Sequence, residues 1–287
     1  MRVMPHRMPS LQYSVEIPAG RIRRPAQVRV RGVRVFIMNS YSLDVSIIIP
    51  VKDEVDSIEP LAREVSEAMT AGARTWECIW VDDGSTDGSL EALGRVSSRD
   101  PRHRYISFEK NAGQSAAFWA GFREARGAVV ATMDGDGQND PRDLPPLIDL
   151  VFSGRADMVN GYRSKRRDGL VRKLSSRVAN GVRNALSGKT VRDVGCSTRA
   201  FRSECVSGLP LFKGMHRFFP TLASLQGFSL SEMPVNHRPR TKGRSKYSVN
   251  NRLWVGLFDL LGVCWLRSRA FHYKIGKRSP SDRGDAK

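Results

Sequence analysis

The chain has 287 residues, of which 40% are hydrophobic, and it carries a formal net charge of +18. This apolar content is enough for one large globular domain, alone or with appendages. The charge predicts an anionic partner, which could be nucleic acid, an anionic membrane surface or a phosphorylated substrate. The four cysteines lack CxxC spacing, which argues against a zinc site or a disulfide framework and favours a reducing compartment. We expect neither a spanning helix nor a secretion signal, because no apolar run reaches roughly 18 residues.

The first 40 residues differ from the rest of the chain. They hold eight arginines and a single acid, Glu16, without a sustained hydrophobic period. We interpret residues 1–40 as a basic disordered arm, or as a mis-assigned start before the first clear strand. The remainder stays basic without this segment, so an anionic partner is expected for the folded part as well.

From residue 45 onwards, apolar runs typical of buried strands alternate with amphipathic runs typical of helices. We predict strands over residues 45–51, 77–81, 105–108, 128–133 and 157–161, and helices over 57–71, 89–96, 114–125 and 144–152. This order predicts an α/β fold with an open, mostly parallel sheet and helices on both faces. In such sheets ligands bind beyond the carboxyl ends of the strands.

The second half is less regular. Residues 170–186 form a predicted helix with apolar positions spaced by four and basic residues on its other faces. Residues 253–266 are nearly all apolar, too few to span a membrane, and are followed by Arg267 and Arg269. They form either a buried C-terminal helix or, as we favour, an amphipathic helix in the membrane interface. We therefore assign residues 249–287 to a membrane-interface helix and a polar tail.

Carboxylates gather at two predicted strand ends. Asp82 and Asp83 follow one strand, and Asp134 and Asp136 follow another. Carboxyl ends of parallel strands meet at one sheet edge, where like charges repel unless a cation lies between them. Hard oxygen ligands beside substrate phosphates suit Mg²⁺ or Mn²⁺. Asp140 is expected instead to cap the helical turn that begins at Pro141.

Five segments in this order resemble known motifs: SIIIPVKDE (46–54), VDDGSTDGS (81–89), MDGDGQNDP (133–141), DVGCSTRAF (193–201) and HRPRTKGRSKYS (237–248). The first three are similar to the nucleotide-sugar domain of family 2 glycosyltransferases. The last two resemble the branch that contains dolichyl-phosphate mannosyltransferase and bacterial polyprenyl-phosphate sugar transferases. The resemblance implies a GT-A-type (Rossmann-like) domain over residues 41–248. Lys52-Asp53 stands where the family usually has Tyr-Asn.

The resemblance also implies roles for residues of this chain. The donor would be bound by Pro50, Glu54, Asp82, Asp83, Gln114, Asp134, Gln138, Arg240 and Lys246. The metal ion would be held by Asp134, Asp136 and Gln138. The acceptor phosphate would be bound by Arg163, Arg172, Ser176 and Ser197. The catalytic residues would be Asp134, Asp136, Arg163, Arg172 and Arg199.

The implied activity is inverting transfer of a sugar from a UDP- or GDP-linked donor to a polyprenyl phosphate, for cell-envelope glycan or lipid modification. A phosphate monoester has a second pKa of about 6, so it needs no dedicated base near neutral pH. The implied location is cytoplasmic, peripheral at the inner face of the cell membrane, with a small membrane partner protein as a further expectation. The alternatives are a saccharide hydroxyl as acceptor and, in another class, a basic nucleic-acid-binding protein. Against the latter, no recognition motif is present.

Overall fold

The computed structural model describes residues 27–30, 33–36, 41–163, 191–239 and 249–269. The chain divides into two compact units, Met1–Ser40 and Tyr41–Lys287. In the first unit, β1 (Gln27–Val30) and β2 (Val33–Phe36) form an antiparallel pair. This pair was not predicted from the sequence, and disorder of the other residues of the unit stays a prediction.

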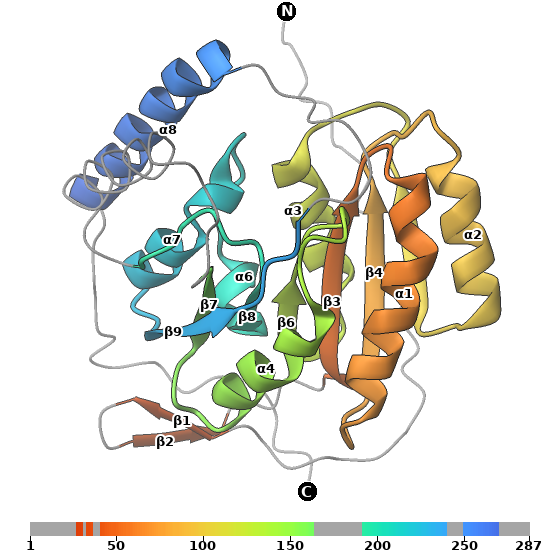
Figure 1. Ribbon diagram of the computed structural model, residues 1–287. Helices are drawn as coiled ribbons and strands as arrows, with labels where there is room; N and C mark the ends of the chain where they lie inside the picture. The colour runs from red at the N-terminus through yellow and green to blue at the C-terminus, as the bar shows by residue number, and fades with distance from the viewer. Residues whose placement is uncertain (1–26, 31–32, 37–40, 164–190, 240–248, 270–287) are drawn as a thin grey trace, which may run out of the picture. The chain divides into compact units, whose positions relative to one another are not determined.

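The second unit is built on a seven-stranded sheet (Figure 1). Its strands are β3 (Leu43–Val51), β4 (Trp76–Asp82), β5 (His103–Ser107), β6 (Gly127–Thr132), β7 (Met158–Arg163), β8 (Arg199–Arg202) and β9 (Leu230–Val235). Their spatial order is β5-β4-β3-β6-β8-β7-β9, and only β8 runs antiparallel to its neighbours. The sheet is therefore mostly parallel, as predicted.

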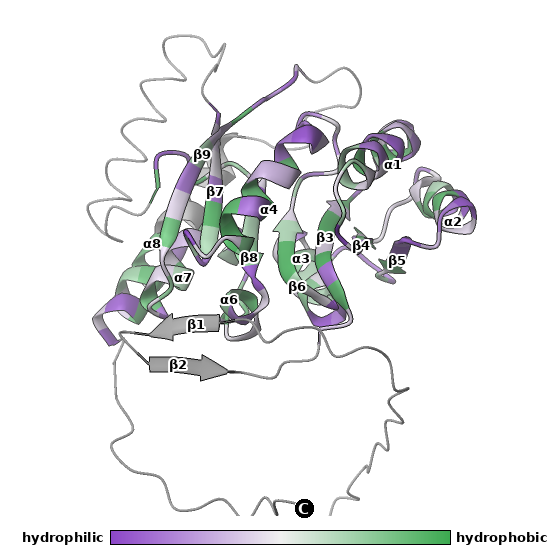
Figure 2. Ribbon diagram, turned by 90° about the horizontal axis from the view of Figure 1, so that it is seen from below, coloured by the Kyte–Doolittle hydropathy of each residue, from purple (hydrophilic) through white to green (hydrophobic). Residues whose placement is uncertain are grey.

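Helices cover both faces of this sheet, as the near end-on view shows (Figure 2). They are α1 (Val55–Thr70), α2 (Ser89–Arg99), α3 (Gln114–Glu124), α4 (Leu144–Phe152), α6 (Ser203–Ser207), α7 (Phe219–Leu225) and α8 (Val249–Arg269), with short 3-10 turns η1 (Pro141–Asp143) and η2 (Met215–Arg217). Successive residues of β3 face opposite cores: Ile47 packs with the α1, α2 and α4 side, and Ile48 packs with the α3, α7 and α8 side. Burial on both faces explains why the central strands are continuously apolar.

The predicted elements of the first half are confirmed, with ends that differ by up to three residues. The elements β8, α6, α7 and β9 were not predicted. β8 is four residues long and has arginine at both ends, so it carries no apolar run that would mark a buried strand. The predicted helix over residues 170–186 lies outside the described residues.

One edge of the sheet collects the segments that carry the sequence motifs. Strands β3, β4, β6 and β7 end there, and the antiparallel β8 begins there. Arg199, the first residue of β8, pairs in register with Thr132 on β6 and with Asn160 on β7. The residues after β6 and before β8 are therefore neighbours, although about 60 residues separate them in the chain.

Candidate active site

Asp82, the last residue of β4, and Asp83, which follows it, are buried and hold the loops at this edge. The carboxylate of Asp82 accepts hydrogen bonds from the Ser85 amide (3.0 Å) and the Ser107 hydroxyl (2.7 Å). Asp83 accepts from the amides of Ala112 (2.7 Å) and Gly113 (3.0 Å), which lead into α3. Both carboxylates thus hold the loops at this edge of the sheet, and their predicted contacts with the nucleoside stay predictions.

The segment after β3 is tied to the segment after β4. Lys52 donates to the carbonyl of Gly84, and Asp53, at φ +50°, accepts from the Thr86 amide (2.7 Å). The amide of Glu54, the residue before α1, donates to the Ser89 hydroxyl (3.0 Å). Pro50 pairs in register with Val81. The structure therefore brings the predicted donor residues Pro50 and Glu54 to the same edge as Asp82 and Asp83.

Asp134 lies directly beyond β6, at the centre of the edge. Its carboxylate accepts a hydrogen bond from the side-chain amide of Gln114 (2.8 Å), at the start of α3. Burial raises the pKa of Asp134, and the nearby charge of Asp136 raises it further, while Ser197 and Arg199 act in the opposite direction. The surroundings of Asp134 therefore disfavour its negative charge. A bound cation would stabilise that charge.

The acidic loop continues through Asp136 to Asp140. Asp136 accepts from the Gln138 amide (3.1 Å), which fixes the turn between them. Asp140 accepts from the Arg142 amide (3.1 Å) and forms an ion pair with Arg238 at 2.9 Å. The capping role predicted for Asp140 is confirmed. Its contacts with Arg142 and Arg238 hold the loop in place.

The chain after β9 pairs with this loop. The amide of Arg238 donates to the carbonyl of Gln138 (2.8 Å), and the Gln138 side chain lies 3.4 Å from the carbonyl of Arg238. Asn139 and His237 form an antiparallel bridge. The predicted metal ligand Gln138 is thus fixed on both its backbone and its side chain.

Two arginines predicted to act on phosphate have protein partners. Arg163 forms a two-point ion pair with Asp193, at 2.7 and 2.9 Å. Arg199 is 2% exposed and donates to Asn160 Oδ1 and to the carbonyls of His216 and Val194, at 2.8–2.9 Å. Both residues lie at this edge of the sheet, where Arg199 holds two backbone carbonyls and Arg163 holds the side chain of Asp193. Their predicted roles at phosphate stay predictions.

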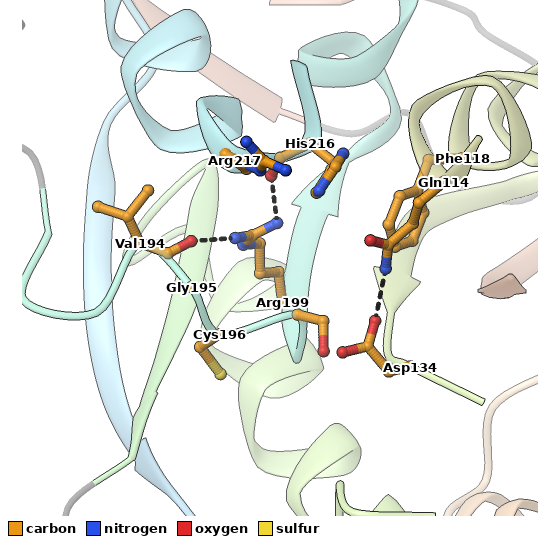
Figure 3. A pocket seen from close by; sticks show the side chains of 10 residues that line it. Gln114, Phe118, Asp134, Val194, Gly195, Cys196, Arg199, His216 and Arg217 are labelled. Carbon is orange, nitrogen blue, oxygen red and sulfur yellow. Dashed lines mark hydrogen bonds between the residues drawn. The ribbon is translucent and has the colours of Figure 1, made fainter. Parts of the chain in front are cut away.

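A pocket of about 260 Å³ lies between the start of α3, the end of β6, the segment that leads into β8, and η2. In Figure 3, Gln114 and Asp134 lie on one side of it, and Arg199 and His216 lie on the other. The remaining lining residues are Phe118, Val194, Gly195, Cys196, Ser197 and Arg217. The pocket therefore has the single carboxylate of Asp134 on one wall and the side chains of Arg199, His216 and Arg217 on the other.

Several residues of this site were not predicted from the sequence. Asp193, Asn160, Ser115 and Arg217 were not singled out for roles, although Asp193 begins the quoted DVGCSTRAF motif. Nothing in that motif pairs Asp193 with Arg163, which lies 30 residues away in the chain. Four predicted residues, Arg172, Ser176, Arg240 and Lys246, lie outside the described residues.

Asp134 and Asp136 fit a divalent cation by their chemistry, because both present carboxylate oxygens and the surroundings of Asp134 disfavour its charge. Within the described residues, no group of three or more His, Cys, Asp or Glu side chains is arranged to hold a metal ion. A cation here would complete its coordination with substrate phosphate oxygens and water, as Mg²⁺ commonly does.

The helices within the described ranges were also considered as membrane spans. None of them combines the length and the apolar character that crossing a bilayer requires. The residues of α8 that the structure leaves exposed include Phe258 (70%), Leu261 (53%) and Trp265 (61%).

The mostly parallel sheet, with its acidic edge, is the architecture of GT-A-type glycosyltransferases. The family model described as glycosyl transferase family 2 matches residues 46–208. The chain belongs to this family and is a glycosyltransferase.

Two curated relatives are similar to this chain over most of its length. The chain is 36% identical over 239 residues to dodecaprenyl-phosphate galacturonate synthase of Rhizobium johnstonii, an alignment covering 81% of this chain and 70% of that protein. It is 38% identical over 220 residues to undecaprenyl-phosphate 4-deoxy-4-formamido-L-arabinose transferase of Pectobacterium carotovorum, covering 76% and 66%. The chain thus spans about two thirds of the length of each relative.

A solved structure shows the same fold. Glucosyl-3-phosphoglycerate synthase of Mycobacterium tuberculosis, crystallised with Mg²⁺ and uridine diphosphate, superposes with a TM-score of 0.60. The match covers 80% of this chain and 81% of that one, at 18% sequence identity. At this sequence identity the comparison establishes the fold of the chain.

Proposed function

We propose that this glycosyltransferase moves a sugar from a nucleotide-sugar donor to the phosphate of a polyprenyl phosphate, with inversion at the anomeric carbon. The observation that carries the proposal is the pocket with opposed walls, in which Asp134 faces Arg199 and Arg217. Such a pocket suits two anions brought together, one neutralised by a cation at the carboxylates and the other by the basic wall.

Asp134 and Asp136 would hold Mg²⁺ or Mn²⁺, and Gln138 would support it from the same loop. When bound, the ion would neutralise charge on the departing diphosphate. Gln114 orients Asp134 through its amide, and the loops held by Asp82 and Asp83 form the nucleoside side of the edge. These residues bind and orient the donor.

The acceptor phosphate supplies its own nucleophile. With a second pKa of about 6, a phosphate monoester is mostly a dianion near pH 7.5, so its oxygen can attack without a general base. The bond from the anomeric carbon to the diphosphate breaks as the bond to the acceptor oxygen forms, and the diphosphate leaves with the electron pair. Arginines at the site lower the energy of two phosphates held close together.

The two curated relatives support the acceptor class. Each is named for a reaction on a polyprenyl phosphate, dodecaprenyl in one case and undecaprenyl in the other. Their sugars differ, so the relatives support the lipid phosphate and leave the sugar of this chain to experiment.

Helix α8 would bring the enzyme to the membrane interface. Phe258, Leu261 and Trp265 are exposed and lie at i, i+3 and i+7, on one face of the helix. Arg267 and Arg269 end the helix, where they would meet anionic headgroups. This supports a peripheral enzyme at the inner face of the cell membrane, where a membrane partner protein could receive the product.

The test is transfer in vitro. The full chain is incubated with undecaprenyl phosphate in detergent, Mn²⁺ and a panel of radiolabelled UDP- and GDP-sugars, and the lipid is extracted. The proposal predicts label in the lipid phase with one donor, abolished by EDTA. Label transferred only to an added saccharide would support a hydroxyl acceptor instead and would refute the proposal.

A further inference from the structure

The arginines around the pocket differ in what their guanidinium groups contact. Arg163 is held by both oxygens of Asp193, and Arg199 donates to three protein acceptors at 2.8–2.9 Å. Each of these groups already has strong partners, so a ligand that enters the pocket would have to compete with them or use the N–H groups that remain.

Arg217, at the end of η2, is different. It lines the pocket, its side chain is 33% exposed, and its only charged partner in the described part of the chain is Asp259 of α8, at 3.8 Å. That separation exceeds a hydrogen bond. Within the described residues the guanidinium of Arg217 therefore keeps its N–H groups available to a ligand.

Asp259 shows that this arrangement is incomplete. Its Oδ2 is buried and has no hydrogen-bond partner among the residues that the structure describes. A buried carboxylate oxygen without a hydrogen bond is costly, so such atoms are rare and call for an explanation. The position of Asp259 next to Arg217 offers an explanation: its carboxylate balances the charge of the Arg217 guanidinium when no ligand anion is in the pocket.

The surrounding backbone fixes Arg217 relative to Asp134. Gly214, at φ +88°, begins η2, and a Cβ at this position would clash with Oδ2 of Asp259. The Gly214 amide donates to the Ser115 hydroxyl (2.9 Å), which also contacts Nδ1 of His216 (2.8 Å). Ser115 follows Gln114, the residue that holds Asp134. A short chain of contacts thus links both walls of the pocket.

We infer that Arg217 binds the phosphate of the acceptor lipid, and that Asp259 is the counter-ion which that phosphate displaces. This inference rests on the proposed function and extends it to a specific ligand. The acceptor is favoured over the donor diphosphate because Arg217 contacts α8, the helix with the exposed apolar face. Asp134, the carboxylate expected to hold the donor's metal ion, lies on the opposite side of the pocket.

The experiment measures binding, so it does not depend on knowing the sugar. Isothermal titration calorimetry with the full chain, UDP and Mn²⁺ compares farnesyl phosphate, farnesol and inorganic phosphate as titrants. The variants are Arg217→Gln, Arg217→Lys, Asp259→Asn and the control Arg95→Gln. Arg95 pairs with Glu59 on the surface, so the control removes one positive charge elsewhere.

Arg217→Gln should weaken farnesyl phosphate binding about tenfold or more, as expected for a lost charge-assisted hydrogen bond. Farnesol and UDP binding should stay unchanged, and Arg217→Lys should fall between wild type and Arg217→Gln. Asp259→Asn should tighten farnesyl phosphate binding, because the competing carboxylate charge is gone. The control Arg95→Gln should match wild type. Inorganic phosphate should bind more weakly than farnesyl phosphate, since it lacks the apolar chain.

Two failures are distinguishable. If wild type prefers farnesyl phosphate to farnesol and Arg217→Gln keeps that preference, the role of Arg217 is refuted and the proposed function stands. If wild type binds farnesyl phosphate no better than farnesol, both the lipid-phosphate acceptor and the role of Arg217 are refuted. Loss of UDP binding in Arg217→Gln, with farnesyl phosphate binding retained, would place Arg217 on the donor and overturn the inference.

Discussion

Arg163 and Asp193 form a two-point ion pair that joins the end of β7 to the segment lining the pocket, with Nε to Oδ2 at 2.7 Å and Nη2 to Oδ1 at 2.9 Å. Burial lowers the pKa of Arg163, but Asp193 outweighs it and the net pKa is raised. An arginine predicted from the sequence to bind the acceptor phosphate therefore also holds Asp193, next to the segment that lines the pocket.

The first prediction concerns this pair. Arg163→Gln and Asp193→Asn should each lower the free energy of unfolding, and the double variant should lose less than the sum. The coupling should be about 1.5–3 kcal/mol, the range for hydrogen bonds to charged groups. Urea denaturation of the four proteins measures it. Additive losses would show that the two side chains act independently.

The acidic loop offers a matched pair of substitutions. Asp136→Asn should abolish Mn²⁺-dependent UDP binding, because it removes one of the two carboxylates expected to hold the ion, and it should leave the fold intact. Asp140→Asn should retain Mn²⁺-dependent binding and lower the free energy of unfolding by about 1–3 kcal/mol, since Asp140 is paired with Arg142 and Arg238. Calorimetry measures the UDP binding and urea denaturation the stability. Loss of Mn²⁺-dependent UDP binding in Asp140→Asn, with binding retained in Asp136→Asn, would contradict the assignment.

Asp134 is predicted to destabilise the metal-free fold at neutral pH. Its pKa is raised by burial and by Asp136, so the folded state favours the protonated form, and stability should increase as pH falls through that raised pKa. Asp134→Asn should therefore raise the melting temperature at pH 7.5 without metal and remove the increase that Mn²⁺ with UDP produces. A variant that melts lower than wild type at pH 7.5 and equally at pH 5 would contradict this.

His103 predicts a second pH effect, far from the pocket. It is buried, accepts from the Trp80 indole (3.0 Å) and contacts the Ser66 hydroxyl (2.8 Å). Burial lowers its pKa from 6.5 to about 4. The unfolded state takes up a proton first, so stability falls between pH 6.5 and pH 4, by on the order of 3 kcal/mol. His103→Gln should be less stable at pH 7 and lose this part of the pH dependence, and an unchanged slope would refute the assignment.

The first half of the fold was predictable because each element carries its own local signal. The run Ile47-Ile48-Ile49 marks a strand buried on both faces, and α1 shows a helical period in Ile58, Leu61 and Val65. Strand β8 lacks such a signal. It is stabilised by pairing with β6 and β7, and long-range pairing leaves no mark on a segment of four residues.

The acidic part of the site was predictable for a related reason: Asp82, Asp83, Asp134 and Asp136 follow strands, and strand ends meet at one edge. The basic part was less so. Asp193 lies 30 residues from Arg163 along the chain, and Arg217 reaches the pocket only because η2 packs beside the start of α3. Such pairings arise from tertiary structure and have no local period.

The most direct test of the account compares two lipids that differ only in the phosphate. With the donor identified by the panel, undecaprenyl phosphate and undecaprenol are offered in the same detergent at pH 7.5, and the lipid product is isolated. The account predicts a sugar phosphodiester from undecaprenyl phosphate, because the phosphate dianion attacks without a base. It predicts no product from undecaprenol, because a hydroxyl acceptor needs a general base and no residue of the site is assigned that role. Comparable transfer to both lipids, or transfer to undecaprenol alone, would contradict it.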